Sequence, residues 1–164
     1  MPDVIAPNLK ILFCGINPSL YSAAVGHHFA RPGNRFWKAL HGAGFTPRLF
    51  SPAEDGELPQ LGYGITNVAP RATARADELS KAELRAGYQL LRDKLQTYRP
   101  DCLAILGISA YRVAFQQPKA KIGPQADWQD TRIWALPNPS GLNAHYQVDD
   151  LARVYGELRQ AVEA

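Results

Sequence analysis

The chain has 164 residues, 46% of them apolar, so it can bury a sizeable core without cross-links, and we expect a single domain over residues 1–164. Its two cysteines cannot supply the four thiolates of an iron–sulfur cluster, and its four histidines show no metal-ligand spacing, so we expect no metal and no cofactor. No segment approaches the roughly 18 apolar residues of a membrane helix, and the first ten residues lack a signal peptide's hydrophobic segment, which predicts a cytoplasmic protein without membrane contact.

The net charge of +3 is small, but the charges are unevenly distributed. Residues 1–50 carry five basic residues and one acidic residue, and residues 81–100 carry five basic and two acidic residues. A basic face near the first loop would suit a phosphate backbone, although an ordinary solvated surface explains the same counts.

The first half of the chain predicts two strands and a helix. Lys10–Cys14 is a short continuous apolar run, which is typical of a buried parallel strand. A loop of small residues over 22–26 follows, and Asn34 can cap a helix over Asn34–Ala43. Residues 46–60 are rich in Pro, Asp and Glu and predict a surface connection, before a second strand over Tyr63–Val68.

The second half predicts three helices and two strands. A capping box at Ser80 and Glu83 indicates where the first of these helices begins. The elements predicted here, in chain order, are a helix from Ser80 that ends at Pro100, a strand over Cys102–Leu106, a helix over Ser109–Gln116, a turn at Gly123-Pro124, a strand over Arg132–Leu136 and a helix from about Val148.

Strands that alternate with helices predict an α/β fold, a three-layer α/β/α sandwich with a short, mostly parallel central sheet. Ligands in such folds bind at the carboxyl ends of the strands. Two predicted strands are followed by the same tripeptide, Asn17-Pro18-Ser19 and Asn138-Pro139-Ser140. Parallel strands would place both turns at one edge of the sheet, where we expect the functional site.

Either Asn-Pro-Ser turn alone can simply terminate a strand. Neither contains a nucleophile–base pair, which argues against covalent acyl transfer, and the chain has no glycine-rich P-loop with lysine, which argues against nucleotide hydrolysis. Amides, backbone N–H groups, the ring of Phe29 and nearby arginines instead suit recognition of a flat heterocycle beside a phosphate chain.

Two segments, GINPSLYSAAVGHHFARPGNRFW (15–37) and LPNPSGL (136–142), resemble the mismatch-specific uracil-DNA glycosylase and thymine-DNA glycosylase family. The segments YGITNVAPRAT, SKAELRAG and CLAILGISAY fall in family order, so the resemblance covers nearly the whole chain. It implies a uracil-DNA glycosylase-like fold and a monomeric, monofunctional enzyme of base excision repair. Such an enzyme flips uracil, and more weakly thymine or modified pyrimidines, out of G·U and G·T mismatches in double-stranded DNA and hydrolyses the N-glycosidic bond.

The resemblance also implies roles for individual residues. Asn17 would position the attacking water, Phe29 would stack on the flipped base, and Leu142 would fill the gap left in the duplex. The residues implied or expected to bind the substrate are Ile16, Pro18, Ser19, Leu20, Ser22, Phe29, Asn67 and Asn138. Those expected to bind DNA are Arg31, Arg35, Ser140, Gly141 and Leu142.

Three positions leave part of this interpretation open. Asn67 can face the pocket or cap its own loop. Ser19 stands where the family commonly has glycine, and Tyr21 is bulky for a loop that lines a small pocket, so the base preference is not settled. The alternative function is a DNA- or nucleotide-binding α/β module without chemistry.

Overall fold

Five strands form one sheet at the centre of the computed structural model, which describes residues 1–163. Their order across the sheet is β2-β1-β3-β5-β4. Their bounds are β1 Ile11–Gly15, β2 Tyr63–Asn67, β3 Cys102–Leu106, β4 Gly123–Trp128 and β5 Thr131–Leu136. All neighbouring strands are parallel except β4, which is antiparallel to β5. The predicted α/β fold with a short, mostly parallel sheet is confirmed.

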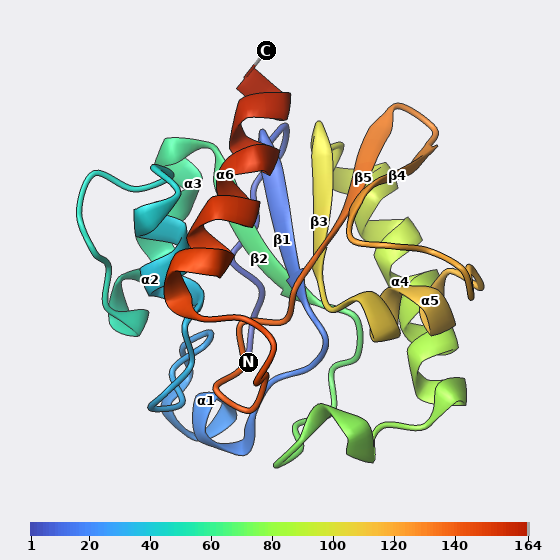
Figure 1. Ribbon diagram of the computed structural model, residues 1–164. Helices are drawn as coiled ribbons and strands as arrows, with labels where there is room; N and C mark the ends of the chain where they lie inside the picture. The colour runs from blue at the N-terminus through green and yellow to red at the C-terminus, as the bar shows by residue number, and fades with distance from the viewer. Residues whose placement is uncertain (164) are drawn as a thin grey trace.

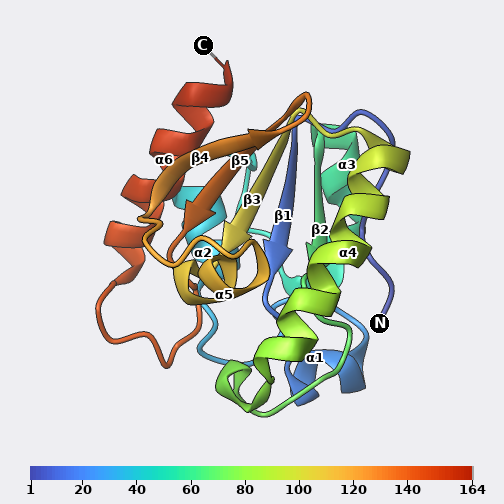
Figure 2. The ribbon, with the colours of Figure 1, turned by 90° about the vertical axis from the view of Figure 1, so that its right-hand side faces the viewer.

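Helices cover both faces of this sheet (Figures 1 and 2). α2 and α6 pack together over one face, and α4 and α5 over the other. The helix bounds are α1 Leu20–Val25, α2 Phe36–Gly42, α3 Leu58–Leu61, α4 Lys81–Tyr98, α5 Ile108–Ala114 and α6 Val148–Glu163, with short 3₁₀ helices η1 Pro52–Glu57 and η2 Ala76–Glu78. Within residues 1–163, none of the helices combines the length and apolar character needed to cross a membrane.

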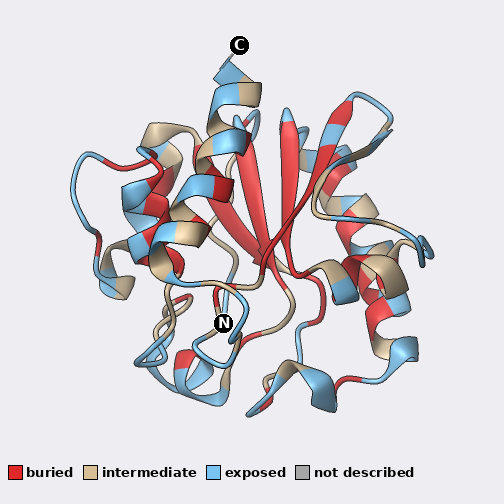
Figure 3. Cartoon of the chain, viewed as in Figure 1, coloured by how far each residue is buried: buried red, intermediate tan, exposed pale blue. Residues whose placement is uncertain are grey.

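The central strands contribute to two separate apolar clusters, because successive side chains of a strand point to opposite faces. Phe13 of β1 lies in the cluster beneath α2 and α6, and its neighbour Leu12 lies in the cluster beneath α4 and α5. Every residue of β1 and of β3 is buried (Figure 3). Burial on both faces explains why these strands read as continuous apolar runs in the sequence.

Three segments differ from the sequence predictions. Residues 20–25 form α1 rather than a loop, because the Ser19 hydroxyl accepts the Ser22 N–H at 3.0 Å and Gly26 ends the helix at a φ of 77°. The connection over residues 46–60 contains η1 and α3. Gly123 and Pro124 belong to β4 rather than to a turn; an edge strand can accommodate proline because one side of its backbone has no partner.

β1, β2, β3 and β5 all end at the same edge of the sheet, as their parallel pairing requires (Figure 2). β1 and β5 flank β3, so the two Asn-Pro-Ser turns that follow them leave this edge one strand apart. The expectation that both turns share an edge is therefore met.

Two helical glycines give a test of this packing. A side chain at Gly87 in α4 would overlap the backbone carbonyl oxygen of Val68, whereas Gly156 in α6 has open space around it. Alanine normally stabilises a helix interior by about 1 kcal/mol relative to glycine. Gly156→Ala should therefore raise the free energy of unfolding, whereas Gly87→Ala should lower it by roughly 1–3 kcal/mol because α4 must shift. Urea unfolding of both variants measures the difference, and a Gly87→Ala protein as stable as the wild type would contradict the close approach.

Candidate active site

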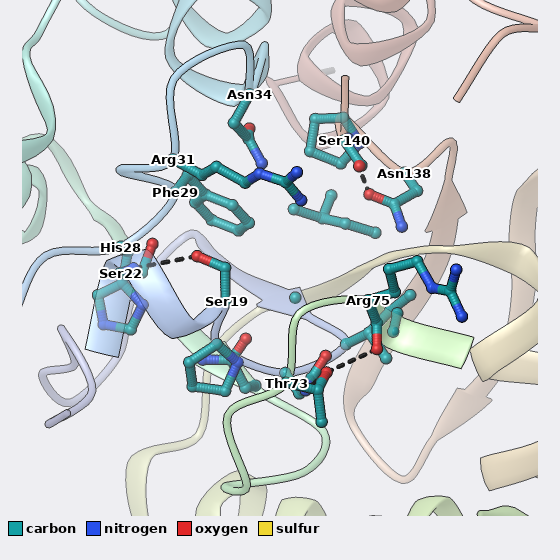
Figure 4. A pocket seen from close by; sticks show the side chains of 18 of the residues that line it. Ser19, Ser22, His28, Phe29, Arg31, Asn34, Thr73, Arg75, Asn138 and Ser140 are labelled. Carbon is teal, nitrogen blue, oxygen red and sulfur yellow. Dashed lines mark hydrogen bonds between the residues drawn. The ribbon is translucent and has the colours of Figure 1, made fainter. Parts of the chain in front are cut away.

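A pocket opens at this carboxyl edge, between the two Asn-Pro-Ser turns (Figure 4). The predicted site residues that line it are Ile16, Asn17, Pro18, Ser19, Ser22, Phe29, Arg31, Asn67, Asn138, Ser140 and Leu142. Leu20, Arg35 and Gly141 are not among the lining residues. Lining side chains that were not predicted include His28, Asn34, Thr73 and Arg75.

Within residues 1–163, the Asn17 amide is hydrogen-bonded only through its nitrogen, Nδ2. Its Nδ2 donates to the backbone oxygen of Arg71 and to Thr73 Oγ1, both at 2.8 Å. Thr73 Oγ1 itself donates to the backbone oxygen of Arg75 at 2.6 Å, so toward Asn17 it can only accept. Both partners of Asn17 are therefore acceptors, which fixes the amide's orientation, and within residues 1–163 its Oδ1 makes no hydrogen bond and stays available in the pocket lining.

The segment that carries Thr73 is joined to the first motif along its backbone. The Leu20 N–H donates to the Thr73 oxygen at 3.1 Å, and the Thr73 N–H donates to the Pro18 oxygen at 3.2 Å. Thr73 is 4% exposed. Its contribution could not be found in the sequence, because Thr73 lies far from Asn17 along the chain and meets it only in the fold.

Arg71, whose backbone oxygen is the second hydrogen-bond partner of Asn17, is held in place by an ion pair. Arg71 donates Nε and Nη2 to the two carboxylate oxygens of Glu83, at 2.8 and 2.9 Å. Glu83 also forms the predicted capping box with Ser80 at the start of α4. Hydrogen bonds from the Arg71 guanidinium and from the Ser80 N–H lower the pKa of the Glu83 carboxyl to about 2, so this pair is charged at neutral pH.

Phe29 forms an aromatic wall of the pocket. Its ring stacks on Phe36 with the centroids 4.1 Å apart. Gly15 lies below it: a Cβ at Gly15 would be 3.2 Å from the Phe29 ring and 2.6 Å from Asn67 Oδ1. The missing side chain of Gly15 thus allows Phe29 and Asn67 to approach over the end of β1.

Two further polar side chains in the pocket lining, Asn67 and Ser22, have hydrogen-bonding atoms that remain available. Within residues 1–163 the Asn67 side chain makes no hydrogen bond, so it is not capping its own loop and both ends of its amide are available. Ser22 is 2% exposed, and its hydroxyl accepts the Ala30 N–H at 2.9 Å. Among residues 1–163 this hydroxyl donates no hydrogen bond, so its proton is available to a ligand.

The second Asn-Pro-Ser turn is stabilised by hydrogen bonds between its own residues. Asn138 Oδ1 accepts the Ser140 N–H at 2.9 Å, which orients the amide and leaves its Nδ2 donors available for a ligand. The Leu142 N–H donates to Ser140 Oγ at 3.2 Å, and Leu142 is 61% exposed. Gly141 lies against the loop before α2, where a Cβ added at Gly141 would be 2.8 Å from the Gly33 oxygen.

The arginines near the pocket have different surroundings. Arg31 is exposed and makes one long hydrogen bond, 3.4 Å, to the Ala74 oxygen. Arg75 is also exposed and pairs with Asp77 at 3.2 Å. Arg35 is half-buried, and its guanidinium donates to carbonyl oxygens of the loop after β5 rather than to solvent.

No aspartate or glutamate is among the lining residues of the described chain. His28 is buried, and its Nε2 lies 2.9 Å from the Pro2 oxygen, to which it can only donate. Burial lowers the pKa of His28, so its imidazole is neutral at neutral pH. Within residues 1–163, no cluster of His, Cys, Asp and Glu could hold a metal ion. The pocket is thus equipped for hydrogen bonding and stacking, with positive charge at its rim.

Two comparisons with known proteins identify the fold and the family of this chain. The solution NMR structure of a protein from Methanosarcina acetivorans, provisionally assigned as a uracil DNA glycosylase, has a similar fold. The match has a TM-score of 0.64 at 18% sequence identity and covers 100% of this chain and 97% of that one. The family model of the uracil DNA glycosylase superfamily matches residues 2–159. This chain therefore belongs to the uracil DNA glycosylase superfamily, and that membership supports a DNA glycosylase activity in general.

Proposed function

We propose that this protein is a cytoplasmic, monofunctional DNA glycosylase of base excision repair, active as a monomer on double-stranded DNA. It would flip uracil out of G·U mismatches and hydrolyse the bond between the base and deoxyribose C1′, and release thymine or modified pyrimidines more slowly. The observation that supports the proposal most is the Asn17 amide, whose donors are both used within the chain and whose Oδ1 is left free at the pocket.

In this mechanism Asn17 Oδ1 accepts a hydrogen bond from a water molecule and directs a lone pair of the water oxygen at C1′. The C1′–N1 bond breaks, its electrons leave with the base as an anion, and the water oxygen bonds to C1′ and releases its proton to solvent. A neutral amide orients water but is not a strong base. Since the described pocket lining lacks a carboxylate, we expect a slow enzyme that depends on positioning.

The negative charge that develops on the base would be met by hydrogen-bond donors. The Nδ2 groups of Asn67 and Asn138 and the hydroxyl of Ser22 are uncommitted donors in the pocket lining. Donors that are already in place when charge develops stabilise a transition state more than solvent does, because they need not reorganise. Phe29 would hold the base by stacking on its face.

Uracil is the expected preferred base for two reasons. Its anion is a better leaving group than that of thymine, and the C5 methyl group of thymine must also fit the pocket. G·U should therefore be processed faster than G·T. The exposed Arg31 and Arg75 at the rim would meet phosphates, so affinity for duplex DNA should fall as salt is raised.

The direct test is base release from a labelled duplex with one G·U pair, followed by alkaline cleavage of abasic sites. We expect cleaved product, more from G·U than from G·T, and the same yield in EDTA because the mechanism uses no metal. A protein that binds this duplex but leaves no alkali-labile site would instead be a binding module without chemistry.

Asn17→Ala should lower the single-turnover rate of uracil release by roughly 10²–10⁴-fold, the range for a lost positioned polar catalyst. Affinity for the mismatched duplex should change little, because the other lining residues are unaltered. Single-turnover rates, duplex affinity and the thermal midpoint are to be measured on one preparation. Near-normal single-turnover rates would remove Asn17 from the mechanism.

Thr73 supplies matched controls for the Asn17 variant. Thr73→Ser keeps the hydroxyl that accepts from Asn17 and should retain the rate of base release. Thr73→Val keeps the shape of the side chain but removes one of the two anchors of Asn17, so its rate should lie between those of the wild type and Asn17→Ala.

Leu142→Ala should impair extrusion of the base rather than the hydrolytic step. An apolar side chain in the vacated space offsets an unstacking free energy of a few kcal/mol, roughly, which single strands do not require. The rate of uracil release should therefore fall on a stable duplex and change little on single-stranded DNA. Equal losses on the two substrates would argue for another role of Leu142.

A further inference from the structure

The loop that carries Leu142 runs from the end of β5 to the start of α6 without regular secondary structure. Most of its internal hydrogen bonds are local, joining residues two to five positions apart, such as the Asn143 N–H to the Ser140 oxygen at 3.0 Å. Local bonds of this kind shape a loop but do not fix its position on the molecule. At its start, the Pro137 oxygen accepts the Tyr155 hydroxyl of α6 at 3.1 Å, and what holds the remainder of the loop must come from elsewhere in the fold.

Arg35 provides the connection for residues 138–146. Its backbone N–H donates to the Pro139 oxygen at 3.0 Å, and its Nε approaches the same oxygen at 3.4 Å. Its Nη2 donates to the Asn143 oxygen at 2.9 Å. Its Nη1 also donates to the Tyr146 oxygen, and its Nη2 also donates to the Ser140 oxygen. Within residues 1–163, every hydrogen bond between residues 138–146 and the rest of the chain is donated by Arg35.

The charge of Arg35 has no carboxylate partner among residues 1–163, so the four carbonyl oxygens are its counterpart. A planar guanidinium presents five N–H donors in a fixed fork, and it can bridge several acceptors that a lysine ammonium, with three donors on one atom, cannot. The close approach of Gly141 to the Gly33 oxygen adds a packing contact from the same turn. Gly33 and Arg35 therefore both contact the loop from the segment that precedes α2.

We infer that Arg35 is a positioning residue for Leu142, holding the loop so that this exposed side chain is already placed to enter the duplex. This inference rests on the proposed function. It assigns the Arg35 guanidinium to the loop's carbonyl oxygens, whereas the sequence suggested a phosphate contact. Holding the loop in advance avoids the ordering entropy that a mobile loop would lose on insertion.

The test compares Arg35→Lys with the wild type, and uses Arg48→Lys as the matched control, because Arg48 is exposed and its hydrogen bonds go to Glu54 and Glu57 rather than to the loop. Single-turnover release of uracil is measured on a G·U duplex and on a single strand. Arg35→Lys should slow the duplex reaction about tenfold or more, since hydrogen bonds to charged groups are each worth more than neutral ones. On the single strand its rate should stay within about twofold of the wild type, and Arg48→Lys should match the wild type on both.

Two further measurements separate positioning from other roles. Hydrogen exchange of the DNA-free protein should speed up in a peptide over residues 138–147 of Arg35→Lys, and not in peptides from the sheet. In the Arg35→Lys background, adding Leu142→Ala should slow the duplex reaction by less than the single substitution does, because the two residues act as one unit.

Either of two results would overturn the inference. Unchanged exchange over residues 138–147 would show that Arg35 does not hold the loop. Equal loss on duplex and single strand, with a reduced salt dependence of binding, would assign Arg35 to a phosphate instead. If the wild type releases no uracil at all, the proposed function fails, and the hydrogen-exchange result still decides whether Arg35 holds the loop.

Discussion

The direction of the hydrogen bonds around Asn17 is the constraint on which the site depends. An asparagine amide has two donors and an acceptor at opposite ends, so it can orient a ligand only if something else decides which end faces it. Here the Arg71 carbonyl and the Thr73 hydroxyl, whose own proton goes to Arg75, both demand donors. The acceptor end is left for the pocket as a consequence of the fold.

The structures that hold Asn17 come from different parts of the chain. β1 delivers the residue to the edge of the sheet, and the segment after β2 supplies both acceptors. The first turn of α4 braces Arg71 through Glu83, and α4 packs so closely on Val68 that only glycine fits at position 87. The stability of the fold and the geometry of the site are thus linked through the same contacts.

The sequence was sufficient for the features that are local. The strands β1, β3 and β5 were predicted because burial on both faces leaves mostly apolar runs, and the repeated Asn-Pro-Ser turn located the edge of the sheet. β4 was missed because it is an exposed edge strand containing glycine and proline. The hydrogen bonds that Thr73 makes to Asn17 and Arg35 makes to the loop after β5 were not predicted, because each joins residues that are distant in the chain, and no spacing rule reports such a pair.

Two kinds of arginine therefore lie within one small region, and they should respond differently to the solution. Arg31 and Arg75 are exposed, so dissolved ions screen them, and attraction to a phosphate chain weakens accordingly. Arg35 is half-buried against uncharged carbonyl oxygens at hydrogen-bonding distance, where screening has little effect. The loop that carries Leu142 should thus keep its shape across salt conditions that alter how tightly the protein holds a nucleic acid.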